Sequence, residues 1–363
     1  MSLQKKDNGM TYAPRTLDGK LKPVCGPGEF PIGVVGLDHG HIYGMCNGLA
    51  EAGAEVKLVY DPDPQKVQAF IKAFPGAHAA REEAEVLDDS TIRLIAGAPI
   101  PAKRGELGLK AMSHGKHCFT DKPPFTTREQ LRLARAKTAG TGLRWAVYYS
   151  ERIHVESSVL AERLIDEGAI GRVVQVMAIA PHRISLAQRP AWFFDKEQYG
   201  GILVDIGCHQ VEQFLYYTKA ADARVDSSRV ANYNFKQYGG FQDFGDATLT
   251  ADNGATAYMR VDWLNPDGLG AWGDGRLFVL GTDGYIELRK YIDVARDREG
   301  DHVFMVDHEG EHYFSAAGTE GFPFFGRHIR DCLDCTKTAY SQETAFRAIE
   351  LSLEAQERAV VVE

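Results

Sequence analysis

The 363-residue sequence is poor in the features that mark several classes of protein. Its six cysteines are scattered rather than densely paired, which excludes a small disulfide-stapled fold and predicts reduced thiols. No stretch approaches the roughly 20 apolar residues of a membrane-spanning helix, and residues 1–31 are polar, without the apolar segment of a secretory signal. The net charge is -9, with no basic block that could follow a phosphate backbone. We therefore expect a cytoplasmic protein that binds neither membranes nor nucleic acid.

The composition that remains, with 44% hydrophobic and 25% charged residues, is that of an ordinary globular enzyme. At roughly 150 residues per domain, the length predicts two domains, each large enough to bury its own core. The pattern along the chain suggests a leader over residues 1–30, a first domain over 31–150 and a second domain over 151–363.

Apolar strands alternate with helices in the first domain. Residues 32–36 form a short apolar run that ends in glycine, as a buried parallel strand would. Further strands are expected at 56–61, 92–96, 117–120 and 143–148, with helices up to about 52 and over 64–74 and 106–113. This alternation predicts an α/β domain with a doubly wound parallel sheet of the Rossmann type.

The second domain has a pattern richer in β-strands. A helix over 154–167 leads into a strand over 172–179, and from residue 324 the pattern is helical again. Between β-prone stretches lie three turn sequences typical of hairpins: Asp252-Asn253-Gly254, Thr282-Asp283-Gly284 and His308-Glu309-Gly310. We predict an α+β domain with a large, mainly antiparallel sheet, whose C-terminal helices could pack back on the first domain.

The segment from Gly36 to Gly44 lies between the first strand and its helix, where a dinucleotide-binding loop would lie. Amide groups at the helix start would there face a pyrophosphate. The spacing is G-x-D-x-G, and Asp38 beside a phosphate would be electrostatically unfavourable. Asp61, about 25 positions after Gly36 at the end of the second strand, is placed to accept a hydrogen bond from a ribose 2′-hydroxyl. That carboxylate favours NAD over NADP.

Two other interpretations of this loop stay open. Gly36 and Gly40 could simply form a tight turn, with Asp61 capping the next helix. His39 and His41 could bind a metal, but an H-x-H pair without a third placed ligand is common in loops. We therefore expect no metal.

A second candidate site combines a carboxylate, an imidazole and an ammonium group. Asp205 and His209 lie four residues apart at the start of an apolar, helical run, and on one helix this spacing puts both on the same face. Lys122 stands before two prolines, which bias it to extended backbone and aim its side chain from a stiff turn. As single residues, His209 could be a buried structural histidine and Lys122 a solvated lysine.

Oxidation of a secondary alcohol needs a base for the hydroxyl proton, a hydride acceptor and positive charge near the developing alkoxide. Neutral imidazole titrates near working pH, so His209 suits the base. Lys122 suits the positive charge. Asp205 suits a positioning role, fixing the lysine or orienting the imidazole.

Together these motifs resemble the glucose-fructose oxidoreductase and inositol dehydrogenase (Gfo/Idh/MocA) family, from about residue 32 to 359. In that family an E-K-P motif and a G-G-G-x-x-x-D-x-G-x-H segment follow the fingerprint loop. The first is represented here by Asp121-Lys122-Pro123. The second keeps Gly200, Gly201, Asp205, Gly207 and His209. Three positions depart from the pattern: Asp121 replaces glutamate, Asp38 replaces the second fingerprint glycine, and Pro99-Ile100-Pro101 replaces the usual T-P-N.

The resemblance implies a catalytic set of Lys122, Asp205 and His209. It also implies a cofactor site in the loops that follow the strands, formed by Gly36, Leu37, Asp38, His39, Gly40, His41, Asp61, Pro99, Asp121 and Lys122. Four residues of the second domain are candidates for the substrate pocket, although no spacing places them: His154, His182, Arg183 and Trp192. Trp263 and Trp272 could line the same pocket but suit ordinary sheet packing better.

We therefore expect an NAD(P)-dependent dehydrogenase, with NAD preferred, which transfers a hydride between the nicotinamide and a secondary hydroxyl of a sugar, inositol or related polyol. Two alternatives stay open: an NAD-dependent glycoside hydrolase that oxidises its substrate transiently, and a non-catalytic NAD-binding regulator. We also expect a cis Lys122–Pro123 bond. A homodimer or homotetramer should form through the open face of the antiparallel sheet.

Overall fold

Two compact units make up the part of the protein that the computed structural model describes, residues 21–363. The parallel-sheet unit comprises residues 21–148 and Phe322–Ala345. The mixed-sheet unit comprises Tyr149–Gly321 and Phe346–Glu363. Most of the predicted leader, residues 1–20, lies outside the described residues.

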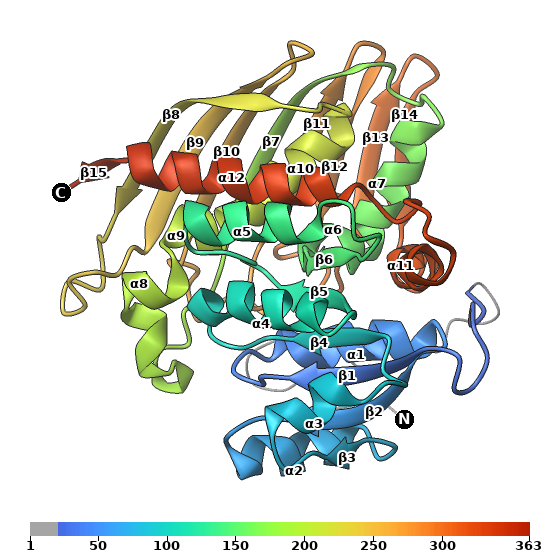
Figure 1. Ribbon diagram of the computed structural model, residues 1–363. Coiled ribbons are helices and arrows are strands. Elements are labelled where there is room, and N and C mark those ends of the chain that lie inside the picture. The colour runs from blue at the N-terminus through green and yellow to red at the C-terminus, as the bar shows by residue number, and fades with distance from the viewer. Residues whose placement is uncertain (1–20) are drawn as a thin grey trace. The chain divides into compact units, whose positions relative to one another are not determined.

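The sheet of the parallel-sheet unit has the strand order β3-β2-β1-β4-β5-β6, and every neighbouring pair is parallel (Figure 1). Its strands are β1 (Pro31–Val35), β2 (Glu55–Tyr60), β3 (His78–Ala79), β4 (Leu94–Gly97), β5 (His117–Asp121) and β6 (Trp145–Tyr148). Its helices are α1 (His41–Glu51), α2 (Pro64–Ala73), α3 (Glu83–Asp88), α4 (Pro101–Ser113), α5 (Arg128–Thr138) and α11 (Pro323–Asp334). The predicted doubly wound parallel sheet is confirmed.

The local sequence explains where these elements begin. All residues of β1, β4 and β6 are buried, which matches their unbroken apolar runs. Helix α2 starts where the Asp63 side chain accepts a hydrogen bond from the Gln65 amide at 2.8 Å. Helix α4 starts at Pro101, five residues before the predicted position, because proline fits the first turn, where its missing amide hydrogen is not needed.

The mixed-sheet unit holds a nine-stranded sheet in the order β14-β13-β12-β11-β7-β10-β9-β8-β15. Its strands are β7 (Val173–Pro181), β8 (Ala223–Ala231), β9 (Phe244–Ala251), β10 (Thr256–Asp262), β11 (Arg276–Gly281), β12 (Gly284–Arg289), β13 (His302–Asp307), β14 (Glu311–Ser315) and β15 (Val360–Val362). Its helices are α6 (Ser150–Ile153), α7 (Glu156–Asp166), α8 (Lys196–Tyr199), α9 (Ile202–Asp205) and α10 (Gly207–Thr218), with 3-10 turns at Leu186–Gln188 and Ala191–Phe194. Helix α12 (Gln342–Arg358) begins among residues of the parallel-sheet unit and continues into this one.

This sheet is mainly antiparallel, as predicted. The parallel pairs are β7 with β10 and β8 with β15. The three predicted hairpin turns join β9 to β10, β11 to β12 and β13 to β14, and each of these pairs is antiparallel. Helix α10 packs on β7 and β10, and α7 packs on β12 and β13.

The prediction that Asp205 and His209 share one helix is wrong in detail. Asp205 ends α9, and His209 is the third residue of α10. The two helices are separated only at Ile206, whose backbone stays in the helical region (φ −97°, ψ −41°). The His209 amide donates to the Ile206 carbonyl at 3.1 Å, a three-residue spacing that tightens the turn there.

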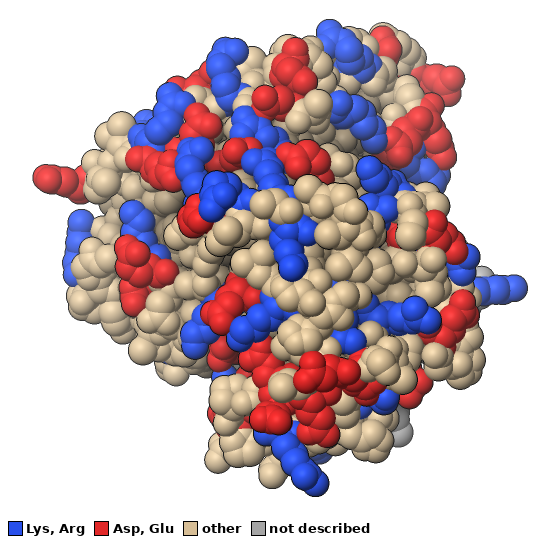
Figure 2. Space-filling model, viewed as in Figure 1, with Lys and Arg blue, Asp and Glu red and all other residues tan. Residues whose placement is uncertain are grey.

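On the face drawn in Figure 2, Lys and Arg side chains are intermixed with Asp and Glu rather than gathered into one basic patch. Among residues 21–363, no helix is both long and apolar enough to cross a membrane.

Candidate functional site

In the loop after β1, the backbone of Gly36 lies very close to Pro99. Gly36 has a φ of +83°, and a Cβ atom added there would lie 2.8 Å from Cβ of Pro99. The Gly36 carbonyl accepts from the Ala98 amide at 3.0 Å, and the His39 amide donates to the Ala98 carbonyl at 3.0 Å. A Cβ added at Gly40, before α1, would meet no atom within 4 Å. The space beside the helix start is therefore open to a ligand, as a dinucleotide requires.

Asp38 replaces the usual glycine without leaving an exposed charge in the loop. Its Oδ1 accepts from Nζ of Lys66 at 2.6 Å, and its Oδ2 accepts from the Ile100 amide at 3.0 Å. The lysine neutralises the carboxylate, and the amide ties the loop after β1 to the residues before α4. The departure at Asp38 is thus accommodated within the same unit.

Asp61 follows β2 and is 6% exposed. Its Oδ2 accepts from the Leu37 amide at 2.7 Å, and its Oδ1 accepts from the Asp63 amide at 2.9 Å. The carboxylate therefore shapes the loop that begins at Gly36. Each carboxylate oxygen has a second lone pair, so this role is compatible with accepting a ribose hydroxyl as well.

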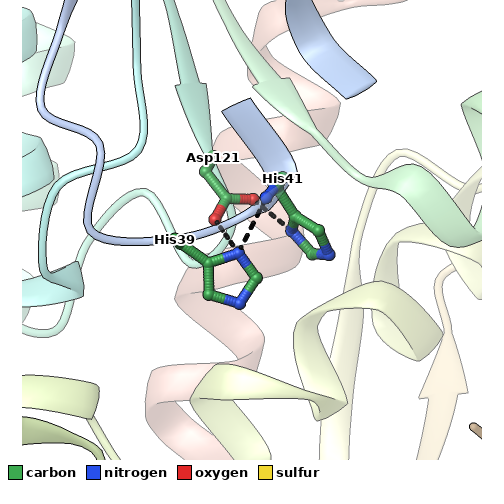
Figure 3. Close-up of side chains that lie close together, drawn as sticks. All are labelled: His39, His41 and Asp121. Atoms are coloured by element: carbon green, nitrogen blue, oxygen red, sulfur yellow. Dashed lines mark hydrogen bonds and ion pairs between the residues drawn. The ribbon is translucent and has the colours of Figure 1, made fainter. Parts of the chain in front are cut away.

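A fully buried carboxylate, that of Asp121, lies at the end of β5 beside His39 and His41 of this loop (Figure 3). Asp121, the last residue of β5, accepts from Nδ1 of His41 at 2.8 Å and from the Lys122 amide at 2.7 Å. Its Oδ2 lies 2.9 Å from a guanidinium nitrogen of Arg104, on α4, and 3.3 Å from Nδ1 of His39. Burial alone would raise the pKa of Asp121, but the charge of Arg104, followed by those of the imidazoles, outweighs it and holds the pKa well below its usual range.

His39 acts as a neutral group in this cluster. Burial, reinforced by His41, lowers the pKa of His39 well below its usual value. The His41 amide donates to Nδ1 of His39 at 3.2 Å, which requires a lone pair on that nitrogen. Nδ1 of both rings and Asp121 lie close enough to hold an ion, since the three ligand atoms are within 4.8 Å of one another. The Arg104 guanidinium on the same carboxylate disfavours a cation there, so the metal interpretation gains no support.

Lys122 directly follows this cluster and is 6% exposed. The Lys122–Pro123 bond is cis, as predicted. Arg104 donates to the carbonyls of Lys122 and Pro123 and, through Nε, to the Pro99 carbonyl at 2.8 Å. Arg104 therefore holds the turn that carries the lysine. The sequence pattern did not indicate this residue, because nothing in the spacing of a helical arginine shows that it is buried.

Asp205 and His209 lie in the mixed-sheet unit, and each is buried, at 9% and 2% exposure. Their segment begins with Gly201, whose φ is +95°, and a Cβ atom there would lie 2.3 Å from Oε1 of Gln356. That same oxygen accepts from the Leu203 amide at 3.1 Å, which fixes the start of α9. The ring of His209 packs edge-on against Tyr149, with centroids 6.0 Å apart.

Arg189 is a second residue that the sequence pattern did not indicate. Its guanidinium carbon lies 4.4 Å from the ring centroid of Phe193 and 4.9 Å from that of Trp263. Burial lowers the pKa of Arg189 to about 10, and the opposite charge of Asp205 counteracts part of that effect. The arginine stays charged at neutral pH and supplies a cation near Asp205 within the mixed-sheet unit.

The four candidate pocket residues have different surroundings. His182 is buried, with ring centroids 4.6 Å from Trp272 and 5.3 Å from Trp263. Arg183 donates to the backbone carbonyls of the loop over 266–269, which favours a structural role. Trp192 packs edge-on against Phe193 in a 3-10 turn, and His154 is half-buried after α6.

The parallel-sheet unit has an open helix start and an acidic residue after its second strand. The mixed-sheet unit carries a buried acid and a buried histidine. Together these features define a dinucleotide-dependent oxidoreductase. A model of an oxidoreductase family with an NAD-binding Rossmann fold matches residues 30–149, and a model of the GFO/IDH/MocA C-terminal domain matches residues 159–287. The chain belongs to the Gfo/Idh/MocA family. It is an NAD-binding oxidoreductase of the sugar and inositol dehydrogenase type.

Relatives of known structure or activity agree with this assignment. A protein of the oxidoreductase class from Erwinia carotovora atroseptica SCRI1043, whose crystal structure is known, is 47% identical over 92% of this chain and 100% of its own, with a TM-score of 0.89. The scyllo-inositol 2-dehydrogenase (NAD(+)) of Bacillus subtilis (strain 168) is 24% identical over 79% of this chain and 80% of its own length. The D-xylose dehydrogenase of Paenarthrobacter nicotinovorans is 34% identical, but the match spans 40% of this chain and 38% of that protein.

Proposed function

We propose that the protein oxidises a secondary hydroxyl of a sugar, an inositol or a related polyol with NAD. The observation that carries this proposal is the burial of His209 at the start of α10 and of Asp205 at the end of α9, within the family's motif. A buried imidazole with a buried carboxylate four positions earlier in the chain suits proton transfer, and the inositol and xylose dehydrogenases act on molecules of this chemical class.

Three side chains each have a separate role in the proposed reaction. His209 accepts the proton of the substrate hydroxyl, and its imidazole later releases that proton to solvent. Lys122 donates a hydrogen bond to the same oxygen and stabilises the negative charge that develops there. Asp205 has a positioning role, either fixing the lysine or orienting the imidazole. Bound NAD supplies the hydride acceptor.

The cofactor is proposed to lie along the loops after the strands of the parallel-sheet unit. The open space at Gly40 supports a pyrophosphate position, and the loop is held by Leu37, His39, His41, Pro99 and Asp121. Asp38 is neutralised by Lys66, which lessens its repulsion of a phosphate. Asp61 faces the ribose, where a carboxylate repels the 2′-phosphate of NADP. His154, His182, Arg183 and Trp192 are proposed to contribute to the substrate pocket, with Arg183 the least supported because one of its terminal nitrogens already donates to the carbonyls of the loop over 266–269.

A panel of sugars, inositols and simple glycosides tests the proposal. We expect NADH formation from at least one free polyol, and calorimetric titration should show tighter binding of NAD than of NADP. Cleavage of a glycoside without net NADH would support the hydrolase alternative instead. Tight NAD binding with no turnover of any member would support the regulator. Equal affinity for NADP would remove Asp61 from the ribose site.

The mixed sheet also suggests how copies of the protein associate. Leu280, Tyr285 and Tyr313 are exposed large apolar side chains on strands of this sheet. Such residues favour a cover over the sheet face, so we propose a homodimer or homotetramer through it. Light scattering showing a stable monomer at micromolar concentration would refute this. We also propose a cytoplasmic location, which the scattered cysteines favour.

A further inference from the structure

A buried carboxylate that the proposed mechanism does not use lies in the mixed-sheet unit. Glu151, on α6, is 3% exposed. Its Oε2 accepts from Nε2 of Gln210 at 2.9 Å and lies 3.4 Å from Nζ of Lys290. Its Oε1 has no hydrogen-bond partner among residues 21–363. An unsatisfied oxygen on a buried charge is costly, so this arrangement calls for a functional explanation.

Lys290 keeps this carboxylate ionised. Its Nζ is 2.6 Å from Oε1 of Gln213 and 3.0 Å from the Glu151 carbonyl, so the ammonium is anchored on the carboxylate's own helix and on α10. Burial disfavours the charged form of Glu151, but Lys290, with smaller effects from His209 and His182, outweighs it and lowers the pKa of Glu151 to about 2. Glu151 is therefore an anion at any working pH.

The residues that hold Glu151 are the neighbours of His209 on α10. Gln210 directly follows His209, and Nε2 of Gln213 donates to the His209 carbonyl at 3.0 Å and to Oε1 of Gln210 at 3.1 Å. His182 faces the carboxylate from the end of β7. Its Nδ1 donates to the Ala180 carbonyl at 3.0 Å, so its Nε2 points toward Oε1 of Glu151, 3.9 Å away and beyond hydrogen-bond distance.

The other charged groups packed around this region are paired elsewhere. Arg152 binds Glu212 at 2.6 Å and Glu162 at 3.4 Å, and Tyr216 donates to Glu162 at 2.6 Å. Asp301 accepts from the Ser157 amide and counteracts the effect of burial on the pKa of Lys290, and Asp205 acts in the same way on Arg189. Glu151 and Glu212 each have one oxygen without a hydrogen-bond partner among residues 21–363, but Glu212 is paired with the Arg152 guanidinium at 2.6 Å, whereas the Lys290 ammonium lies 3.4 Å from the other oxygen of Glu151.

We propose that Glu151 is a positioning residue that stabilises the protonated form of His209 while the alcohol is oxidised, with Lys290 holding it in place. The proposal rests on the proposed function, in which His209 takes the hydroxyl proton as the hydride leaves the same substrate carbon for the nicotinamide. Each proton transfer adds one positive charge to the imidazole, and a fixed anion in a dry environment favours that charged form. Glu151 itself stays unprotonated, and the proton passes from His209 to solvent.

The titration of His209 in the intact protein tests this directly. Histidines labelled with ¹³C at Cε1 are followed by NMR from pH 5 to 9, and the His209 signal is assigned by its loss in His209→Asn. We expect Glu151→Gln to lower the pKa of His209 by about one to three units, the scale of losing an opposite charge that acts on a buried group. In turnover with a polyol, the acidic limb of the kcat profile should move to lower pH by the same amount, because the free base then persists at lower pH.

Two further variants make the result specific. Glu156→Gln removes another buried carboxylate of the same unit, one that accepts from the Gly321 amide at 2.7 Å, and should leave the His209 titration unchanged. If Glu151→Gln does not fold, the double variant Glu151→Gln/Lys290→Gln leaves no unbalanced charge and should still lower the pKa of His209. An unchanged or raised pKa in either Glu151 variant overturns the proposal. Because the titration needs no substrate, that failure is distinct from failure to oxidise any polyol.

Discussion

Both units bury a carboxylate beside histidines, but they surround it in different ways. In the parallel-sheet unit, Oδ1 of Asp121 accepts hydrogen bonds from His41 and the Lys122 amide, and Oδ2 forms an ion pair with Arg104 at 2.9 Å. In the mixed-sheet unit, Glu151 is held through one oxygen, by Gln210 and Lys290. Oδ2 of Asp121 faces a guanidinium at 2.9 Å, whereas Oε1 of Glu151 faces the His182 imidazole at 3.9 Å, so Glu151 keeps more of its negative charge available to a neighbour. We therefore assign Asp121 a structural role in holding the Lys122 turn, and Glu151 an electrostatic role in stabilising protonated His209.

The largest effect is expected where the chemistry itself is removed. His209→Ala and Lys122→Ala should each lower kcat by on the order of 10² to 10⁴, the usual scale for losing an acid–base group or a preorganised donor. The measurement is NADH formation on the best substrate of the polyol panel. NAD affinity should change much less in His209→Ala, because the cofactor is assigned to the other unit. Wild-type turnover in both variants would refute the assigned roles.

The next largest effect is expected in the cluster formed by Asp121, Arg104, His39 and His41. Arg104→Met leaves Asp121 as a buried charge without its guanidinium partner, so we expect a loss of about 3–5 kcal/mol in the free energy of unfolding. Urea denaturation measures it. Lys57→Met is the matched control, since Lys57 pairs with Asp89 at 2.7 Å in a partly exposed position and should cost less than about 1 kcal/mol. If both variants lose the same small amount, the Arg104 cluster is not what holds the turn.

The sequence allowed the fold to be predicted more completely than the site. Hydrophobic periodicity and turn chemistry are local, so the alternation of strands and helices and the three hairpins follow from segments such as 32–36 and the turn at Gly254. Lys122, Asp205 and His209 were found because they belong to spaced motifs. Arg104 and Glu151 carry no such signal, because their burial depends on contacts between segments far apart in the chain. The break at Ile206 was also missed, since nothing in an apolar run marks a tightened turn.

A smaller effect is expected in how the stability of each unit depends on pH. In the parallel-sheet unit, burial lowers the pKa of His117 to about 4 and that of His328 to about 3. Unfolded histidine takes up a proton near pH 6.5, so stability should fall as pH drops below that value and continue to fall until those folded pKa values are reached. The lowered pKa of Glu151 acts in the same direction, but only below the ordinary carboxyl value near 4.5.

His328→Phe tests the contribution of His328 to this pH dependence. A phenyl ring should pack well there, because the ring of His328 stacks on Phe324 with centroids 5.7 Å apart. Between pH 6 and pH 4 the variant should lose less stability than wild type, by up to about 1.4 kcal/mol for each pH unit. Urea denaturation at a series of pH values gives the slope. His114→Gln removes an exposed histidine and should leave the slope unchanged. Equal slopes for wild type and His328→Phe would show that His328 does not stay neutral.

The central claim, that His209 takes a proton while a hydride leaves a substrate carbon for NAD, is tested most directly by isotope transfer. A polyol that the panel identifies as a substrate is prepared with deuterium on the carbon that bears the reacting hydroxyl. The account predicts that the deuterium appears on the nicotinamide ring of the NADH formed, and that His209→Ala slows this transfer without redirecting it. Deuterium that is lost to water, or that remains in the product while no NADH accumulates, would contradict the claim.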